Sequence, residues 1–372
     1  MATVLGIIFS NILHTNETFE VTKVRTIASV PIGGRYRLID FPLSCMVNAG
    51  VSSVGIITKS NYLSLMDHVG SGKEWDLARK SGGLTIIPPY GQADKPYNSR
   101  LDALKNIVKF IEDSKEEYVI LTDCYNFSNI SYSDVIKYHE EKGADITCLY
   151  RENNKEIKTN FNANIFTLDD DGRITNMDIV KEYEGIKKAS IDICYLKKDL
   201  LVSLITKSID GNYSSFNNDL LRRHLKSLKI YGYNFDGFFG NLLSLKAYYD
   251  VNMSLLDKKV RNEMFNKRGM PILTKIRDSA PAYYGEDSKV VNSLIADGCI
   301  IEGEVYDSII FHGSKIEKGA IVRDSILMQD TIVARNVVLN TVITDKNVRI
   351  LHTKKVEGTK EKPKFVNKNG VL

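Results

Sequence analysis

Asp123 is the first residue of this chain whose position suggests chemistry. It ends the apolar segment YVILTD, residues 118–123, and ligands of open α/β sheets bind beyond the carboxyl ends of strands. A carboxylate at such a place can hold Mg²⁺ against a nucleotide phosphate. A helix cap or a turn would explain the same aspartate without any ligand.

A second set of side chains could bind phosphate through charge. Arg35 and Arg37 alternate along the segment that follows the turn at Gly33-Gly34. Arg25 precedes this turn. A guanidinium group presents several donors in a planar fork that suits phosphate oxygens. The three arginines are therefore candidates for binding the phosphate of an activator, although a solvated face would account equally well for Arg35 and Arg37.

The turn after the first apolar run is unusual for a nucleotide-binding protein. Residues 4–9, VLGIIF, have the character of a buried strand, and residues 10–14 read SNILH, without glycine. A phosphate-binding turn is usually glycine-rich, because its backbone N–H groups must approach the phosphate closely. The apolar Ile12 and Leu13 predict that this segment packs over the pocket or against a neighbouring chain.

Strands and helices alternate as far as about residue 255. Apolar runs indicate strands at residues 51–58, 118–123 and 144–150. Helical patterns occupy residues 42–50, 101–113 and 132–144. Apolar strands that alternate with helices in this way are typical of a parallel sheet covered on both faces.

A different rhythm begins near residue 286. Four similar segments recur at steps of 15, 17 and 16 residues: Asn292-Ser-Leu-Ile, Asp307-Ser-Ile-Ile, Asp324-Ser-Ile-Leu and Asn340-Thr-Val-Ile. Aliphatic residues recur within them every five or six positions, at Val305, Ile310, Ile316, Ile321, Ile326, Ile332, Val337, Val342 and Val348. One inward residue on each side of a triangular coil gives this spacing, so it predicts a parallel β-helix of about four coils. A β-sandwich of short strands is the alternative.

Three regions follow from these patterns. We expect an α/β domain over residues 1–255, a helix and connector over 256–285, and a β-helix domain with a C-terminal tail over 286–372. The tail after Leu351 is rich in lysine, which predicts a solvated terminal arm.

Composition excludes several classes of protein. The 372 residues carry a formal net charge of +4, too small a bias to indicate nucleic acid binding. No apolar run approaches the roughly 20 residues needed to cross a bilayer, and the N-terminus lacks the features of a signal peptide. The five cysteines form no C-x-x-C pair, which favours free thiols in a reducing compartment. We therefore expect a cytoplasmic protein that binds neither membranes nor nucleic acid.

Several segments resemble one enzyme family. PIGGRYRLIDFPLSCMVNAGV, residues 31–51, is similar to the pattern P-F-G-G-K-Y-R-I-I-D-F-x-L-S-N-x-x-N-S-G-I of ADP-glucose pyrophosphorylases, which are glucose-1-phosphate adenylyltransferases. The resemblance continues in HVGSGKEWDL, GGLTIIPPY and YNFDGFFGNLLSLKAYYDVNMSLL, at residues 68–77, 82–90 and 233–256. It implies a Rossmann-like (GT-A-like) nucleotidyltransferase domain with a mixed sheet, followed by a left-handed parallel β-helix of the hexapeptide type. The implied reaction converts ATP and glucose 1-phosphate into ADP-glucose and pyrophosphate, the committed step of bacterial glycogen synthesis.

The resemblance fails at the positions that serve the nucleotide. The family's phosphate loop, G-G-x-G-T-R-L-x-P-L-T, has no counterpart here, and Ile27 stands at the catalytic lysine of R-A-K-P-A-V-P. The motif G-T-A-D-A near the base corresponds to residues 99–103, SRLDA. Arg100 and Leu101 should obstruct this pocket, while Asp102 persists as a remnant of the nucleotide site.

The metal and sugar positions are also altered. The resemblance places the first metal aspartate at Asp123 and the second at Asn241, whose missing charge weakens Mg²⁺ binding. The sugar-phosphate motif F-V-E-K-P is absent, and only Lys181 could replace its lysine through a shift of register. Ser190 matches the serine of S-M-G-I-Y, but Asp192 stands in place of the glycine.

These changes favour a regulatory, non-catalytic chain that resembles the D-type subunit of the family. Its expected partner is a catalytic ADP-glucose pyrophosphorylase subunit in a hetero-oligomer, a tetramer by analogy with the family; a homo-oligomer and an anionic phosphometabolite effector are also consistent with the sequence. One alternative is a weakly active adenylyltransferase that uses Asp123, Asn241, Lys181 and Arg25. Another is a phosphometabolite sensor of the same fold. A hexapeptide acyltransferase, suggested by His312, is a more distant alternative, because such enzymes need no large α/β domain.

Overall fold

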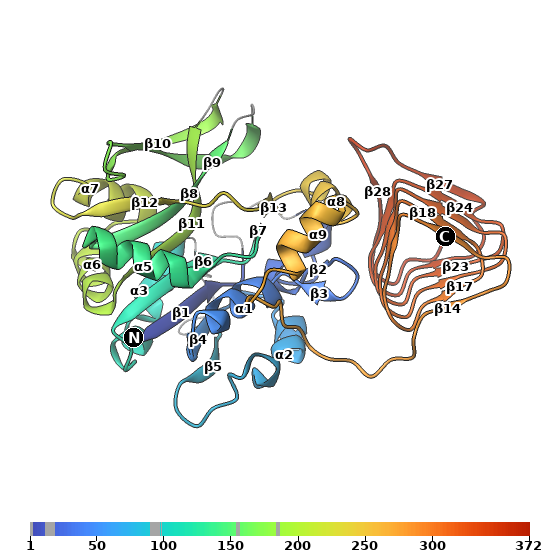
Figure 1. Ribbon diagram of the computed structural model, residues 1–372, viewed down its shortest axis with the longest axis horizontal. Helices are drawn as coiled ribbons and strands as arrows, with labels where there is room; N and C mark the ends of the chain where they lie inside the picture. The colour runs from blue at the N-terminus through green and yellow to red at the C-terminus, as the bar shows by residue number, and fades with distance from the viewer. Residues whose placement is uncertain (1–2, 12–18, 90–96, 98, 154–156, 184–186) are drawn as a thin grey trace.

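The computed structural model describes residues 3–11, 19–89, 97, 99–153, 157–183 and 187–372. An α/β domain and a β-helix lie side by side, with helices α8 (Leu245–Ser254) and α9 (Lys258–Phe265) between them (Figure 1). Ile12 and Leu13, predicted to cover the nucleotide pocket, lie outside the described residues. No helix in the described ranges is long and apolar enough to span a membrane.

The α/β domain is built on one mixed sheet of nine strands, which confirms the predicted fold class. The strand order is β10-β9-β11-β6-β1-β4-β5, and β8 pairs with both β11 and β12. β1 runs parallel to β4 and β6, whereas β11 runs antiparallel to β6 and β8. The bounds are β1 Val4–Phe9, β4 Ser53–Ile57, β5 Gly83–Ile87, β6 Tyr118–Asp123, β8 Ile146–Asn153, β9 Ile157–Leu168, β10 Ile174–Tyr183, β11 Lys187–Lys197 and β12 Ile230–Asn234.

Helices cover both faces of this sheet, because alternate side chains of each buried strand point to opposite sides. Leu5 and Ile7 of β1 enter one apolar core, whereas Val4 and Ile8 enter the other. The remaining helices are α1 Asp40–Asn48, α2 Leu63–Val69, α3 Arg100–Asn106, α4 Val108–Glu112, α5 Tyr132–Lys142, α6 Lys198–Asp210 and α7 Arg222–His224. Shorter helical turns are η1 Glu20–Thr22, η2 Ile27–Ser29, η3 Lys73–Trp75 and the π-helical η4 Phe216–Leu221.

The helix predicted over 101–113 is interrupted. It divides into α3 and α4 at Ile107, whose backbone (φ −109°, ψ 9°) leaves helical geometry. Two small ladders complete the domain: β2 (Pro31–Ile32) pairs with β3 (Tyr36–Arg37), and β7 (Asn126–Phe127) pairs with β13 (Gly240–Asn241). All five cysteines are buried and free, as the sequence predicts.

The C-terminal part is a parallel β-helix of the left-handed hexapeptide type, made of three sheets with five strands each. One sheet contains β14 Tyr283–Tyr284, β17 Ile300–Ile301, β20 Lys315–Ile316, β23 Ile332–Val333 and β26 Arg349–Ile350. The second contains β15 Lys289–Val291, β18 Glu304–Tyr306, β21 Ile321–Arg323, β24 Val338–Asn340 and β27 Lys355–Glu357. The third contains β16 Leu294–Ile295, β19 Ile309–Ile310, β22 Ile326–Leu327, β25 Val342–Thr344 and β28 Lys364–Val366.

The Asx-Ser repeat forms one corner of the β-helix. Asn292, Asp307 and Asp324 have φ values of 45°, 44° and 44°, a left-handed conformation that Asn and Asp tolerate better than other side chains. The serine after each of them accepts a hydrogen bond from the next coil. Its donors are the backbone N–H groups of Ser308, Ser325 and Val342, at 3.1, 3.0 and 3.1 Å. The repeat therefore joins successive coils through a ladder of serine hydroxyls.

Three details of the predicted β-helix are wrong. Val322 and Val333 fill the interior in place of Ile321 and Ile332, and Ile326 packs toward the α/β domain. There are five coils instead of four. The tail after Leu351 is not a free arm, because β27 and β28 pair in parallel with β24 and β25 and complete the last coil.

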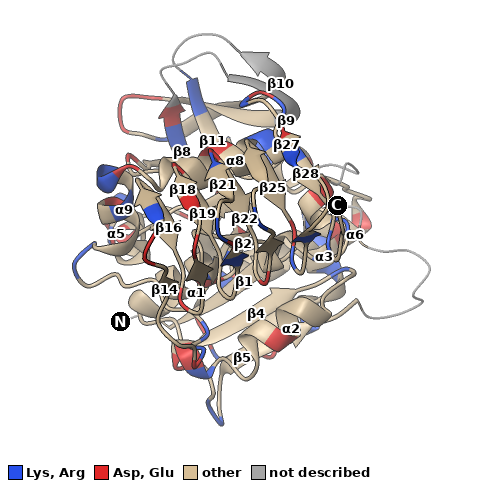
Figure 2. Ribbon diagram, turned by 90° about the vertical axis from the view of Figure 1, so that its right-hand side faces the viewer, with Lys and Arg blue, Asp and Glu red and all other residues tan. Residues whose placement is uncertain are grey.

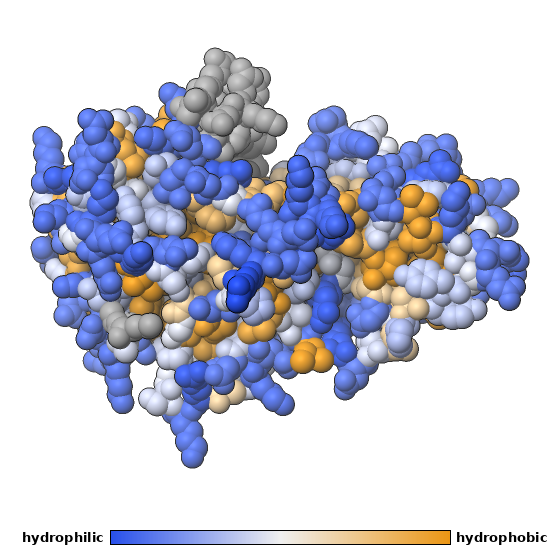
Figure 3. All heavy atoms as spheres, viewed as in Figure 1, coloured by the Kyte–Doolittle hydropathy of each residue, from blue (hydrophilic) through white to orange (hydrophobic). Residues whose placement is uncertain are grey.

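The third sheet of the β-helix packs on the α/β domain. Ile309, Ile326 and Ile343 share one apolar core with Tyr248 and Leu255 of the helical segment. Charges of both signs are interspersed over the two parts when the molecule is viewed from the β-helix side (Figure 2). In the face shown in Figure 3, apolar side chains form patches on both the α/β domain and the β-helix, within a mostly hydrophilic surface.

A buried ion pair joins the two domains within this interface. Nη2 of Arg25 lies 2.7 Å from Oδ1 of Asp345, and the two side chains are only 3% and 2% exposed. Arg25 also donates to the carbonyl oxygen of Val21 at 3.2 Å. Both charges are removed from water, so each depends on the other for its compensation.

We expect Arg25→Ala to lower the free energy of unfolding by about 3–5 kcal/mol, because it leaves the carboxylate of Asp345 buried without its counterion. Urea denaturation followed by circular dichroism measures this loss. Asp287→Asn is a matched control, since Asp287 pairs with Lys318 at 2.7 Å on the exposed surface and its removal should change stability little. Equal losses in the two variants would contradict a structural role for the buried pair.

Candidate functional site

Asp123 lies where the sequence places it, at the carboxyl end of β6. It is in register with Phe9, the last residue of β1, and its side chain is 1% exposed. The site around Asp123 is therefore enclosed by protein. It lies at the carboxyl ends of the parallel strands, where ligands of open α/β sheets bind.

Arg100 enters this site from the first turn of α3. Its Nε lies 3.7 Å from Oδ2 of Asp123 and its Nη1 lies 3.6 Å from Oδ1 of Asp192. The guanidinium carbon lies 4.8 Å from the ring centre of Phe9 and 5.3 Å from that of Phe216. Burial alone would lower the pKa of Arg100, but attraction by the two carboxylates outweighs it and raises the pKa, so the group carries a permanent charge.

Asp192 completes this cluster from β11. Its carboxylate accepts hydrogen bonds from the hydroxyl of Tyr125 and, at 3.3 Å, from Nδ2 of Asn217. Burial, together with Asp192 and Asp123, raises the pKa of Tyr125 well above its usual value. The tyrosine is therefore a neutral donor at neutral pH. Arg100, Asp123, Asp192 and Tyr125 together form a closed polar cluster inside the domain.

The other residues that were expected to remain from an active site differ in their burial and contacts. Ser190 accepts a hydrogen bond from the backbone of Asp192 at 3.1 Å, and Asp102 lies half-buried in the first turn of α3, capped by Ser99. Asn241 lies on β13, exposed. Lys181 belongs to β10, and its side chain lies outside the described part of the chain. Across the described residues, no three His, Cys, Asp or Glu side chains are grouped to hold a metal ion.

A second site lies at the junction of the two domains. It is a cavity of about 260 Å³ whose walls come from the β2–β3 hairpin, the connector and the β-helix. Its described lining carries five Lys or Arg side chains and two histidines, against one acidic residue, Asp297. The basic side chains are Arg35, Arg37, Lys275, Arg277 and Lys346. Such an excess of positive charge in a concave site favours an anionic ligand.

Arg37 forms the hairpin wall of this junction cavity. Its side chain is largely buried and donates to the backbone and hydroxyl oxygens of Ser64. Burial lowers the pKa of Arg37 to about 10, while Asp40 opposes this shift. Arg35 is exposed beside it. Arg25 belongs to the same junction but is committed to Asp345, so Arg35 and Arg37 are the predicted phosphate-binding arginines that line the cavity.

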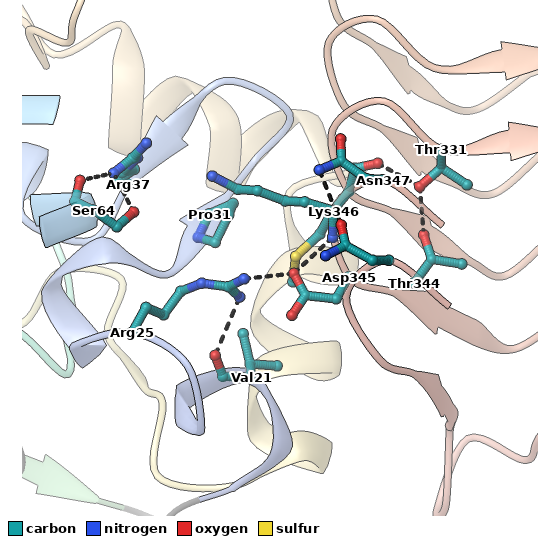
Figure 4. Close-up of polar contacts among 12 residues, drawn as sticks. Val21, Arg25, Pro31, Arg37, Ser64, Thr331, Thr344, Asp345, Lys346 and Asn347 are labelled. Atoms are coloured by element: carbon teal, nitrogen blue, oxygen red, sulfur yellow. Dashed lines mark hydrogen bonds and ion pairs between the residues drawn. The ribbon is translucent and has the colours of Figure 1, made fainter. Parts of the chain in front are cut away.

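Lys346 extends into the junction cavity from the β-helix, toward Pro31 and the hairpin (Figure 4). Burial lowers the pKa of Lys346 to about 7, and the charges of Arg37, Arg25 and Arg277 add to this shift. A lysine in this state is poised to gain a proton when an anion arrives, because the anion's charge compensates that of the ammonium group.

His312 lies on the β-helix wall of the junction cavity. Its Nδ1 lies 3.1 Å from the carbonyl oxygen and 3.4 Å from the Oδ2 of Asp297, and 3.3 Å from the hydroxyl of Ser279. Hydrogen bonding and the nearby His312 and Arg35 lower the pKa of Asp297 despite its partial burial. The ring thus links the connector to the β-helix and forms part of the cavity.

The two parts of the chain match two known families. Residues 19–178 match the nucleotidyl transferase family, and residues 280–367 match the family described as GlmU-like, C-terminal hexapeptide. The chain is 31% identical over 350 residues to the glycogen biosynthesis protein GlgD of Bacillus subtilis (strain 168), which covers 94% of this chain and 91% of that protein.

Enzymes show nearly the same similarity. The glucose-1-phosphate adenylyltransferases of Bacillus cereus (strain ATCC 10987 / NRS 248) and Bacillus anthracis are each 30% identical over 335 residues, covering 89% of this chain and 88% of theirs. The chain belongs to the glucose-1-phosphate adenylyltransferase family. The similarity to the adenylyltransferases extends over nearly the whole length of the chain.

Sequence reasoning found only part of these two sites. It placed Arg100 in the nucleotide pocket of the adenylyltransferase fold as an obstruction, but did not foresee that it pairs with Asp123 and Asp192. It also missed the share of Lys275, Arg277 and Lys346 in the junction cavity. The signal that could have indicated them is the excess of basic residues in the connector and beside the last repeat.

Lys346 should make stability depend on pH. Below about pH 7 the folded protein holds a buried ammonium group; between about pH 7 and 10.5 the folded chain loses this proton while the unfolded chain keeps it, so stability rises with pH. Lys346→Gln should therefore unfold at a higher urea concentration than wild type at about pH 6, and this difference should shrink by about pH 10. A difference that is constant with pH would contradict the lowered pKa.

Proposed function

We propose that this chain is a regulatory, non-catalytic subunit of glucose-1-phosphate adenylyltransferase in glycogen biosynthesis. The enzyme that it would regulate forms ADP-glucose and pyrophosphate from ATP and glucose 1-phosphate. The proposal goes beyond membership of the family. Membership alone does not decide the role, because relatives of nearly equal identity include both the protein GlgD and the enzymes.

The contrast between the two sites supports this proposal. At the catalytic edge, Ile27 stands at the family's lysine position and is buried in η2, only 2% exposed. Catalysis of phosphoryl-group transfer depends on cations that stabilise the charge that develops on the phosphates. At the junction, by contrast, basic residues face a cavity. The chain has thus kept groups suited to binding an anion while it lacks the lysine suited to the chemistry.

An anionic phosphometabolite is the effector that the junction cavity suits. Its volume of about 260 Å³ and its arginine and lysine side chains fit phosphate groups, which guanidinium and ammonium groups bind through charged hydrogen bonds. Both domains line the cavity, so a bound anion would change the free energy of their packing. A partner subunit could sense that change through a shared interface.

The proposed partner is a catalytic subunit of the same family, in a hetero-oligomer of tetrameric type. We also propose a cytoplasmic location, which five free and buried thiols support. A weakly active adenylyltransferase remains the alternative, with Asp123, Asn241 and Lys181 as its ligands. Arg25, the fourth residue of that alternative, is paired with Asp345.

Adding this chain to the catalytic adenylyltransferase of the same organism should change kcat, an apparent substrate affinity or the response to a phosphorylated activator by about 5-fold or more, the usual range of allosteric coupling. Initial rates of ADP-glucose formation at increasing ratios of the two chains measure this effect. Unchanged kinetics at every ratio, together with no association in analytical ultracentrifugation, would contradict a regulatory role.

An activity assay of the purified chain alone distinguishes a non-catalytic subunit from a weakly active enzyme. We expect no ADP-glucose at high protein concentration. Turnover that Asp123→Asn abolishes would instead support the alternative of a weakly active adenylyltransferase.

The junction cavity should bind a divalent anion. Sulfate is a suitable probe, because its charge stays constant near neutral pH, and Arg277→Ala should weaken its binding about tenfold or more through loss of a charged partner. Isothermal calorimetry gives the affinity. Arg79→Ala is the matched control, since Arg79 is also partly exposed but pairs with Asp76 away from the cavity. Equal weakening by both substitutions would show that sulfate does not bind there.

A further inference from the structure

The cluster at the end of β6 holds one cation and two carboxylates in a space nearly closed to water. The side chains of Arg100 and Asp123 are each 1% exposed, and that of Asp192 is 13% exposed. Three separate elements supply them: α3, β6 and β11. Because the sheet brings these elements together, the cluster forms only in the folded domain.

Two of these residues are departures from the family pattern. Arg100 stands at the threonine of G-T-A-D-A, and Asp192 stands at the glycine of S-M-G-I-Y. The chain therefore carries a positive and a negative charge at two positions that are uncharged in the family pattern. They lie 92 residues apart in the sequence, and Nη1 of Arg100 lies 3.6 Å from Oδ1 of Asp192.

The backbone of Asp192 shows that its position still has the geometry of a glycine. Its φ is +57°, in the left-handed region that glycine adopts without strain and other residues adopt less readily. Its carboxylate contacts Arg100, Tyr125 and Asn217, and these contacts compensate for the strain. The side chain of Asp192 is thus held by an ion pair and two hydrogen bonds.

A divalent metal does not fit beside this arginine. Mg²⁺ requires oxygen ligands in octahedral geometry at about 2.0–2.1 Å, and it would be repelled by a guanidinium nitrogen that already lies 3.7 Å from Oδ2 of Asp123. Asn241, at the second metal position, lies exposed on β13 and offers an amide oxygen without charge. The side chains around Asp123 therefore suit the internal cation better than a metal.

We propose that Arg100 is a built-in counterion that takes the place of the divalent metal at Asp123, with Asp192 as its second carboxylate. This inference deepens the proposed non-catalytic function and rests on it for the identity of the metal position. The guanidinium group balances the charge that a metal would balance, and it links α3, β6 and β11 in one fixed arrangement. The domain then needs neither metal nor nucleotide to stabilise its former active site.

Removing the arginine should convert the cluster into a metal site. Arg100→Thr removes the cation that contacts both Asp123 and Asp192, and paired carboxylates suit Mn²⁺ as well as Mg²⁺. We expect this variant to bind Mn²⁺ at least about tenfold more tightly than wild type, as measured by the electron paramagnetic resonance signal of free Mn²⁺. Mn²⁺ should also raise its Tm by several degrees and leave that of wild type unchanged.

Matched variants identify the residue that is responsible. Asp192→Gly keeps Arg100 and should stay without Mn²⁺, whereas Arg100→Gln keeps both carboxylates beside a neutral side chain and should bind it even if the Arg100→Thr variant fails to fold. Adding Asp123→Asn should abolish any binding that is gained. Circular dichroism confirms the fold of each full-length variant.

Two results would overturn the proposal. One is wild-type Mn²⁺ binding that depends on Asp123 and is as tight as that of Arg100→Thr. The other is a folded Arg100→Thr or Arg100→Gln variant whose affinity for Mn²⁺ and whose Tm in Mn²⁺ do not differ from those of Asp192→Gly. Neither measurement involves the adenylyltransferase partner, so failure of the regulatory proposal and failure of this one are distinguishable.

Discussion

The arrangement of the two domains depends on the buried ion pair between Arg25 and Asp345. Apolar packing of the β-helix on the α/β domain is broad and tolerates small shifts, but two desolvated charges must meet in one geometry. Lys346 follows Asp345 in the chain, so the ion pair also fixes where this lysine faces Arg37. The ion pair thus helps to hold the two walls of the junction cavity in place.

The two sites differ in whether their charges are balanced within the protein. At the end of β6, every charge of the cluster has its counterion within the protein, since Arg100 lies between Asp123 and Asp192. At the junction, basic side chains exceed acidic ones, and burial together with the neighbouring arginines lowers the pKa of Lys346. A balanced cluster has no electrostatic need of a ligand, whereas an unbalanced one gains stability from an anion. The charges of the first site are thus balanced within the protein, whereas the second site keeps an excess of positive charge.

Much of this fold could be predicted because its patterns are periodic or local. Buried strands such as 4–9 and 118–123 are continuous apolar runs, and the step of about 16 residues indicates a coil with three sides. Neighbouring residues of a strand point to opposite faces, so a spacing of five or six could not decide between Ile321 and Val322. The strands at residues 355–357 and 364–366 were not predicted, because their lysines indicate a solvated segment. Val356 and Val366 nevertheless point toward the core. The pairing of Arg100 with Asp192 could not be predicted, because only the topology of the sheet brings α3 and β11 together.

The position of strand β28 implies an order in which the parts of the molecule fold. The backbone N–H of Asp345 donates to the carbonyl oxygen of Val366 at 2.9 Å, so the residue that pairs with Arg25 is itself held by residues 364–366. During synthesis, the α/β domain leaves the ribosome long before this strand does, and domains generally fold as they emerge. Arg25 then lacks its counterion until Asp345, which lies 320 residues later in the chain, has been synthesised. The junction therefore forms late, and a newly made chain can assemble the junction cavity only after its β-helix is complete.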